Sequence, residues 1–299
     1  MSGTVKAPLR CAWMTLMSSR LFQQIKNGFI IPGAWDSWED YRNRLTALIL
    51  EKAIGPKDSL LILGAGGCCD IDLNILAEHC EKIVLLDTDS SAMREALARY
   101  HLETSSKVSL ACESLTGISE SDIEAFFQNL LAFVMSQGVR LTEEAFRTRT
   151  LEGLQVLEQK LYVTGEQFAG VLVPESCDAV VCAGVHSQLF SLLSYSWKVL
   201  AANVSEQIFR RTIKEEWFHE KIRGWNDGII PMLDKAMIHA AKKKALFGCE
   251  YDLVSPIEGA YQCISDLRRN SSEIGSLVWP FDPEHGKQYV MRFFLCNNS

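Results

Sequence analysis

The sequence predicts an α/β fold, namely an open and mostly parallel seven-stranded sheet with helices on both faces and an antiparallel hairpin at its C-terminal end. Three observations lead to this prediction. Short apolar runs recur along the chain, and they alternate with segments whose apolar residues are spaced three and four apart. A segment rich in turn formers separates the last two apolar runs.

The first strand–helix units lie between residues 59 and 100. The run Ser59–Leu63 follows the breaker Gly55-Pro56 and contains only apolar residues after its first position, as is typical of a strand covered on both faces. A second run, Lys82–Asp87, ends in an acidic residue. Helical patterns follow each run. Further strands are predicted at 107–112 and 178–183, so the alternation continues as a parallel sheet.

The stretch between the third and fourth predicted strands is much longer than a crossover requires. Residues 117–172 contain two amphipathic helical patterns, one around Phe127 and Leu130 and the other around Phe146 and Leu154. We expect an inserted helical hairpin here. Two interpretations stay open: the hairpin packs on the sheet, or it covers the substrate site as a lid.

The C-terminal third predicts helices, one more strand and the hairpin. Helical patterns are expected at 188–202 and 206–244, the second broken near Gly224, Gly228 and Pro231 and including the basic run 242–244. A fifth strand is expected at 250–255 and a helix at 257–269. The closing hairpin comprises strands at 274–279 and 288–295.

The domain organisation follows from these elements. Helices are expected at about 9–28 and 37–54, which makes residues 1–55 an N-terminal helical lid. Residues 56–299 form one α/β domain with the insertion at about 117–172. No repeat or low-complexity linker divides it.

Composition limits the classes of partner. A net charge of −7 argues against a surface that neutralises phosphates, so we expect no nucleic-acid partner. The sequence has no secretory signal and no apolar stretch of about 18 residues, so we expect no membrane partner and a cytoplasmic location. The 10 cysteines include no CxxC pair, which predicts free thiols and neither a metal site nor a disulfide framework. The oligomeric state stays open.

A glycine-rich loop after the first strand carries the main functional signal. Gly64 and Gly66 lie where the strand turns into a helix, and glycine there lets backbone N–H groups approach a ligand closely. Asp87, at the end of the next strand, has the position and chemistry to accept hydrogen bonds from two ribose hydroxyls. Together these features predict a cofactor that contains adenosine.

The residues after the loop distinguish between two such cofactors. The dinucleotide fingerprint requires a glycine at position 69, where the chain has Cys69. Asp70 and Asp72 would repel a pyrophosphate, whereas they would favour the ammonium group of a sulfonium cofactor. We therefore expect S-adenosylmethionine.

With its first strand followed by Gly64-Ala65-Gly66 and its second strand ending in Asp87, the chain resembles the class I S-adenosylmethionine-dependent methyltransferase superfamily, which has a Rossmann-like fold. The resemblance covers about residues 56–200, and Cys68 stands where the family usually has a third glycine. It implies SN2-type methyl transfer. We expect a small-molecule or peptide acceptor, because the acidic net charge and the lack of an Asn/Asp-Pro-Pro-Tyr type sequence after the fourth strand disfavour a nucleic acid. The cofactor-binding residues expected from loop chemistry and resemblance together are Gly64, Ala65, Gly66, Asp70, Asp87, Thr88, Glu113, Ser114, Leu115, Ala183 and Gly184.

The sequence gives weaker signals for the residues that contact the methyl acceptor than for those that bind the cofactor. His186 follows the fourth strand, and it is expected either to remove a proton from the acceptor or to order the loop. Gln188 binds substrate or begins the next helix. An aromatic and basic group near the N-terminus is expected either to contact the acceptor or to anchor a helix to the core. Its members are Trp35, Trp38, Tyr41 and Arg44.

Two other functions are also compatible with the sequence. One is a nicotinamide-dependent oxidoreductase, which Cys69 and the lack of a Tyr-x-x-x-Lys pair disfavour. The other is a regulatory protein that binds the cofactor without catalysis.

Overall fold

The computed structural model describes residues 20–267 and 271–298. Its internal contacts divide the chain into two compact units. The helical unit comprises the described parts of 1–30, 117–161 and 190–222, and the sheet unit comprises 31–116, 162–189 and the described parts of 223–299. Residues 31–55, which the sequence groups with an N-terminal lid, thus pack with the sheet.

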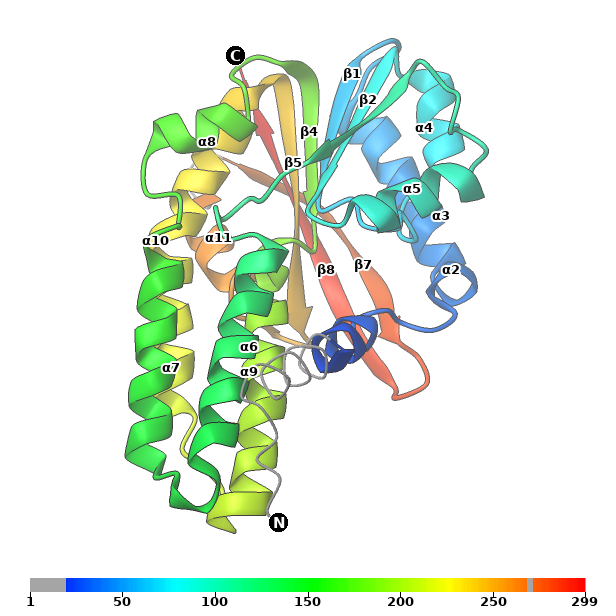
Figure 1. The fold of residues 1–299 in the computed structure, drawn as a ribbon. Coiled ribbons are helices and arrows are strands. Elements are labelled where there is room, and N and C mark those ends of the chain that lie inside the picture. Colours follow the sequence, from blue (N-terminus) through cyan, green and yellow to red (C-terminus); the bar gives the residue numbers. More distant parts are fainter. Residues whose placement is uncertain (1–19, 268–270, 299) are drawn as a thin grey trace. The chain divides into compact units, whose positions relative to one another are not determined.

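The sheet unit is built on one mixed sheet (Figure 1), and this confirms the predicted fold class. The strand order is β3-β2-β1-β4-β5-β8-β7, with the two-residue strand β6 paired to β5. The first five strands are parallel, and β8 is antiparallel to both β5 and β7. The strands are β1 (Ser59–Leu63), β2 (Lys82–Asp87), β3 (Val108–Cys112), β4 (Cys177–Ala183), β5 (Ala241–Asp252), β6 (Ser255–Pro256), β7 (Ser272–Asp282) and β8 (Lys287–Asn297).

Helices cover both faces of the sheet. Successive side chains of a strand point to opposite faces, and the apolar strands therefore need cover on both. On one face Leu60, Ile62 and Ile83 join a continuous core with the elements α2 (Ala34–Ser37), α3 (Glu39–Leu48), η1 (Ile49–Ala53), α4 (Leu73–His79) and α5 (Ser90–Arg99). On the other face lie α8 (Gly165–Val171), α11 (Ala260–Leu267) and the sheet-unit part of α10 (Glu216–Ala240).

The helical unit contains most of the predicted insertion. Its elements are a helix over 20–27, α6 (Glu120–Gln137), η2 (Gly138–Arg140), α7 (Glu143–Glu158), α9 (Ser191–Val204), η4 (Ser205–Phe209) and the start of α10. Trp197 organises the core, since its ring stacks on Phe218 at 4.0 Å and also packs against Phe146. The two predicted insertion helices therefore form, while residues 1–19, where the first predicted helix begins, lie outside the described part.

The basic run 242–244 corrects a sequence prediction, because it lies on β5 and not on a helix. Alanine and lysine favour helices locally, but pairing with β4 and β8 on either side decides the conformation. The lysines find partners there: Lys243 Nζ bonds to Asp58 at 2.5 Å, and Lys244 Nζ to the Lys52 carbonyl at 2.8 Å. The fifth strand thus begins at Ala241 and ends at Asp252, short of the predicted Ser255.

The predicted breaks near Gly224, Gly228 and Pro231 are also wrong, since α10 runs through all three positions. Buried side chains recur along the helix at three- and four-residue spacing, among them Ile222, Trp225 and Ile229. Burial of this continuous apolar face outweighs the local preferences of glycine and proline.

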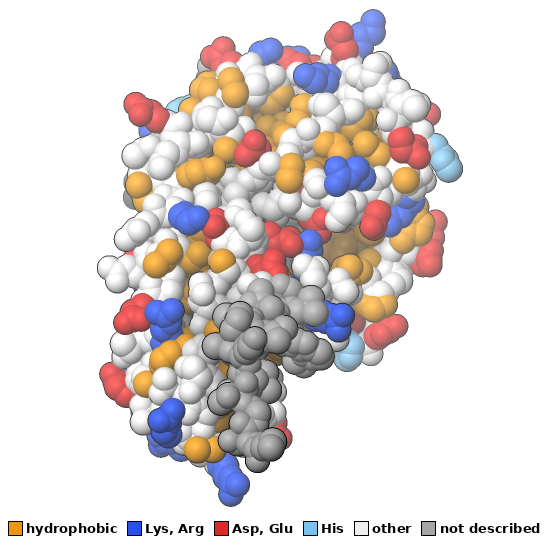
Figure 2. Space-filling model, viewed as in Figure 1, with side chains coloured by type: hydrophobic (Ala, Val, Ile, Leu, Met, Phe, Trp, Pro, Cys, Tyr) orange, Lys and Arg blue, Asp and Glu red, His pale blue; other side chains and the backbone are white. Residues whose placement is uncertain are grey.

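The surface carries charges of both signs. Figure 2 shows acidic and basic side chains interspersed over the visible face, in keeping with the net charge of −7. In the part of the chain that the structure describes, none of the helices has both the length and the apolar character needed to span a membrane.

Candidate cofactor site

The site begins with a tight turn after β1. Gly64 and Gly66 have φ values of 65° and 47°, in the left-handed region that glycine adopts readily. A Cβ on Gly64 would lie only 2.5 Å from Val185 Cγ2, whereas a Cβ on Gly66 would meet nothing within 4 Å. Gly64 therefore allows the loop to pack against the end of β4, and Gly66 leaves open space beside the backbone.

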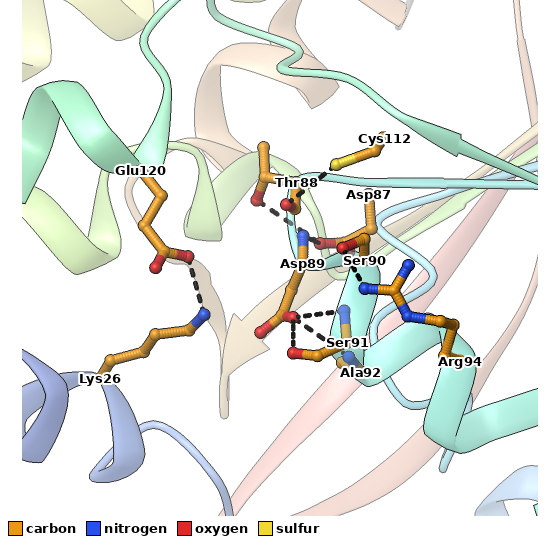
Figure 3. Close-up of polar contacts among 10 residues, drawn as sticks. All are labelled: Lys26, Asp87, Thr88, Asp89, Ser90, Ser91, Ala92, Arg94, Cys112 and Glu120. Atoms are coloured by element: carbon orange, nitrogen blue, oxygen red, sulfur yellow. Dashed lines mark hydrogen bonds and ion pairs between the residues drawn. The ribbon is translucent and has the colours of Figure 1, made fainter.

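Asp87 joins this turn to the end of β2, and Figure 3 shows its contacts on the β2 side. Its Oδ2 accepts a hydrogen bond from the Gly66 backbone N–H at 2.9 Å. Its Oδ1 accepts one from the Asp89 N–H at 2.8 Å. Asp89 then caps α5 by accepting bonds from Ser91 and Ala92. A carboxylate has about four acceptor positions, so Asp87 keeps capacity for ligand hydroxyls.

The register of the parallel strands brings the predicted cofactor residues to one edge of the sheet. Leu63 pairs with Leu86 and with Cys182, and Asp87 pairs with Cys112, so the loops that follow β1 to β4 leave from the same edge. This carboxyl edge is where open α/β sheets bind ligands. The loops carry the predicted residues Gly64, Ala65, Gly66, Asp70, Thr88, Glu113, Ser114, Leu115 and Gly184, beside Asp87 and Ala183 at the strand ends.

These residues differ in how accessible they are. Thr88 and Glu113 are exposed, Ser114 is half-buried, and Leu115 is buried. The Glu113 N–H donates to the Asp87 carbonyl at 3.2 Å, which holds the β3 loop beside the end of β2. Thr88 and Glu113 are therefore accessible to a ligand on this edge, whereas Leu115 contributes packing.

Side chains outside the predicted cofactor-binding set hold the backbone of the glycine loop. Arg99 Nη1 donates to the Gly67 carbonyl at 2.7 Å, and Tyr100 Oη donates to the Cys68 and Ile71 carbonyls at 3.2 and 2.5 Å. Arg42, which is 6% exposed, donates to the Cys69 carbonyl at 3.1 Å. These donors pair with carbonyls of the loop and so stabilise one path for its backbone.

Trp35 completes this arrangement. The guanidinium carbon of Arg42 lies 3.8 Å from the centre of the Trp35 ring, and that of Arg99 lies 4.9 Å from it. Arg42 also donates to the Trp35 carbonyl at 2.7 Å. The sequence left two roles open for Trp35, contact with the acceptor or anchoring of a helix; in the structure its ring packs against both arginines that hold the loop.

Asp70 lies half-buried at the end of the loop. Burial raises the pKa of its carboxyl from 3.8 to about 6, although a backbone hydrogen bond and the Arg42 charge oppose the shift. A carboxylate whose hydration is reduced in this way gains from a cationic ligand group. This environment is compatible with the prediction that Asp70 lies near the ammonium group of a sulfonium cofactor.

The other predicted acceptor residues have varied surroundings. Tyr41 is buried and stacks on Trp279 at 5.6 Å, and Trp38 packs edge-on to the same ring at 5.0 Å. Both positions fit the alternative in which the aromatic residues anchor a helix. Arg44 is exposed beside Asp40, and Gln188 is exposed and donates to Ser187 Oγ at 3.1 Å.

Glu250 and Trp279 were not predicted as site residues. Glu250 is fully buried on β5, and its Oε1 lies 3.4 Å from the place of a Cβ on Gly184. Ser187 Oγ donates to this oxygen at 2.5 Å, while Glu250 Oε2 and Trp279 Nε1 have no partner among the described residues. Burial raises the Glu250 pKa, against the effect of the Ser187 hydrogen bond. The signal in the sequence was a single glutamate inside the apolar run 245–251.

His186 lies beneath the loop that follows β4, with 1% of its surface exposed. Its Nε2 is 2.7 Å from Asp234 Oδ1 on α10. Burial lowers the His186 pKa, but the Asp234 charge and hydrogen bond raise it by more. These surroundings match the expectation of a residue that orders the loop better than that of an exposed base.

The sheet unit as a whole is a Rossmann-like fold, on the strength of its own strand order and register. No protein-family model matches the sequence, and no curated protein matches it either.

Among solved structures, the chain is similar to the N-methyltransferase NodS from Bradyrhizobium japonicum WM9 in complex with S-adenosyl-L-homocysteine, with 13% identity, a TM-score of 0.45 and coverage of 93% of this chain and 97% of NodS. A SAM-dependent methyltransferase from Aquifex aeolicus gives 10% identity, a TM-score of 0.42 and coverage of 92% and 98%. Magnesium protoporphyrin IX methyltransferase from Synechocystis PCC 6803 gives 10% identity, a TM-score of 0.40 and coverage of 100% and 87%.

Proposed function

We propose that this chain is a methyltransferase that binds S-adenosylmethionine at the carboxyl edge of β1, β2 and β3. The observation that carries the proposal is the hydrogen bond between the Gly66 N–H and Asp87 Oδ2, at 2.9 Å, beside space that no side chain fills. It joins a close-approach glycine turn to an acidic acceptor suited to ribose hydroxyls.

Individual residues then have separate roles toward the cofactor. Asp87 accepts hydrogen bonds from the ribose, and Thr88 and Glu113 border the adenine. Gly64 to Gly66 line the methionine portion, and Asp70 pairs with its ammonium group. When bound, S-adenosylmethionine supplies an electrophilic methyl group on a positively charged sulfur.

The N-terminus of α4 favours this cofactor over a nicotinamide dinucleotide. Asp72 caps the helix by accepting a hydrogen bond from the Ile75 N–H at 3.1 Å, so a carboxylate already lies where a pyrophosphate would bind. Cys69 occupies the position of the third glycine in the dinucleotide fingerprint. Both features disfavour the oxidoreductase alternative.

Methyl transfer requires the acceptor atom in line with the bond between the sulfur and the methyl carbon. With the cofactor bound there, the acceptor's lone pair would form the bond to the methyl carbon, and S-adenosylhomocysteine would be the leaving group, keeping the electron pair of the broken bond. We assign the border of the methyl group to Ala183 and Gly184. Glu250, beside Gly184, is our candidate for contacting the acceptor or receiving its proton, and the acceptor itself is proposed to be a small molecule or peptide.

Calorimetric titration of the full chain with S-adenosylhomocysteine, S-adenosylmethionine and NAD tests the cofactor. We expect binding in the micromolar range for the first two. Asp87→Ala should weaken the binding free energy by at least about 2 kcal/mol, because charge-assisted hydrogen bonds disappear. The control Asp36→Ala, at an exposed position on α2, should leave the binding free energy unchanged. Binding of NAD alone, or no binding by a folded protein, would overturn the proposal. Tight binding without turnover over an acceptor panel would instead support the regulatory alternative.

A further inference from the structure

A buried cluster on the α10 and α11 face of the sheet has no role in the proposed methyl transfer. It comprises His186 after β4, Asp234 on α10 and Cys263 on α11, and one ligand atom of each lies within 4.8 Å of the others. All three side chains are buried, with Asp234 and Cys263 at 0% exposure. Distant parts of the sequence thus bring nitrogen, oxygen and sulfur donors to one point.

Two atoms of this cluster have no hydrogen-bond partner among the described residues. They are His186 Nδ1 and Asp234 Oδ2, since the bond between these side chains uses only Nε2 and Oδ1. Buried polar atoms are almost always paired, and a buried carboxylate is costly unless its charge is balanced. Asp234 Oδ2 is thus available as a metal ligand.

A second thiol lies beside this cluster and adjoins one of its three members. Cys249 on β5 places its Sγ 3.6 Å from Cys263 Sγ. Two thiolates on one tetrahedral zinc, each about 2.3 Å from the metal, lie about 3.8 Å apart. The observed separation therefore matches a pair of zinc ligands, whereas a disulfide would require the two sulfur atoms to be about 2 Å apart.

We propose that His186, Asp234 and Cys263 bind a zinc ion, and that Cys249, whose Sγ adjoins that of Cys263, closes on the metal as the fourth ligand. The donors favour zinc over magnesium or calcium, which prefer sets of oxygen ligands. On binding, two S–H bonds break, two Zn–S bonds form, and the thiol protons pass to solvent; the imidazole binds as the neutral ligand. Four protein ligands leave no open position, so the ion is structural.

Such an ion would link four segments of the sheet unit. His186 lies two residues after Gly184, and a Cβ on Gly259, just before α11, would lie only 2.3 Å from the His186 carbonyl oxygen. The loop after β4 already packs tightly against the start of α11. Zinc would fix this loop to β5, α10 and α11 and so hold in place the backbone that borders the proposed methyl site.

Metal analysis of the full-length protein, expressed in zinc-supplemented medium and dialysed, tests the inference. We expect about one zinc per chain in the native protein and in the control Cys80→Ser, because Cys80 is equally buried but lies at the end of α4. Cys263→Ser and Cys249→Ser should lose the metal. Zinc below stoichiometry in the native protein, or equal zinc in all variants, would overturn the proposal.

A second measurement on the native chain avoids dependence on how the variants fold. Removal of zinc with a chelator should lower the melting temperature, and titration with Co²⁺ should give the absorption bands of a tetrahedral thiolate site. Absence of those bands, or a Cys249–Cys263 disulfide found by mass spectrometry, would contradict the inference. Calorimetry with S-adenosylhomocysteine is read separately, so failure of the metal site and failure of the cofactor proposal are distinguishable.

Discussion

At the scale of single residues, the site depends on carboxylates whose surroundings differ. Asp87 is half-buried and bonded to two backbone N–H groups, whereas the Asp70 pKa is raised to about 6 by burial. The two residues are therefore suited to different ligand groups, hydroxyls for Asp87 and a cation for Asp70.

The raised Asp70 pKa predicts a pH-dependent affinity for the cofactor. A raised acid pKa means that the carboxyl is largely neutral below pH of about 6 and becomes ionised as the pH increases. Because only the ionised form attracts an ammonium group, S-adenosylhomocysteine should bind several-fold more tightly at pH 7 than at pH 5. Calorimetry across this range measures the change.

Asp70→Asn is the matched variant, since it keeps the shape of the side chain and removes the titration. Its affinity should be lower at pH 7 and nearly independent of pH over the same range. An equally steep profile in this variant would assign the dependence to another group.

At the scale of elements, the glycine loop owes its path to α3 and α5. Arg42 on α3 and Arg99 on α5 donate to loop carbonyls and pack on Trp35. The loop sequence predicts a close-approach turn, but neither its composition nor its spacing indicates which distant donors hold it. From the sequence alone, an arginine at these helical positions is equally compatible with a solvated surface residue.

Arg42→Lys should destabilise the protein by about 1–3 kcal/mol, because lysine keeps the charge but cannot donate to both carbonyls while packing flat on Trp35. Urea unfolding measures this loss, and calorimetry should show weaker cofactor binding. Arg44→Lys is the control: Arg44 is 54% exposed in a pair with Asp40 at 3.6 Å, so its substitution should change stability by less than about 0.5 kcal/mol. Similar losses in both variants would contradict this role for Arg42.

At the scale of the whole molecule, the strands of the sheet unit are joined by side-chain contacts as well as by backbone hydrogen bonds. Asp178 at the start of β4 accepts hydrogen bonds from the Ser59 N–H and Oγ of β1, at 2.9 and 2.7 Å. It also pairs with Lys243 of β5 at 3.2 Å. One carboxylate thus links three neighbouring strands at the edge opposite the glycine loop.

This link predicts how stability depends on pH. The Ser59 hydrogen bonds, with help from Lys243, lower the Asp178 pKa from 3.8 to about 2. A lowered acid pKa stabilises the folded state fully above the unfolded value and loses that effect as the pH falls toward the folded value. We expect Asp178→Asn to cost about 2 kcal/mol at pH 7 and progressively less between pH 4 and pH 2. Urea unfolding at each pH measures the difference; a constant difference would rule out the ionised carboxylate as its source.

Much of this architecture was predictable from local patterns. The strands β1 to β4, the closing hairpin, the left-handed glycine turn and the acidic end of β2 follow from apolar periodicity and from the backbone freedom of glycine. These features depend on neighbours within a few residues, which a single sequence contains. The start of β5 and the continuity of α10 were mispredicted, because distant strands and a buried helix face decide them.

The sequence by itself determined the parallel α/β class of this protein, because short-range periodicity encodes it, and it predicted the Gly64 to Asp87 region as the site that we propose for an adenosine cofactor. Only the tertiary structure decided that Arg42, Arg99 and Tyr100 hold the loop, that Glu250 lies beside Gly184, and that His186 meets Asp234 and Cys263. Those residues are far apart along the chain, and their encounter depends on strand register and on which face of the sheet each helix covers.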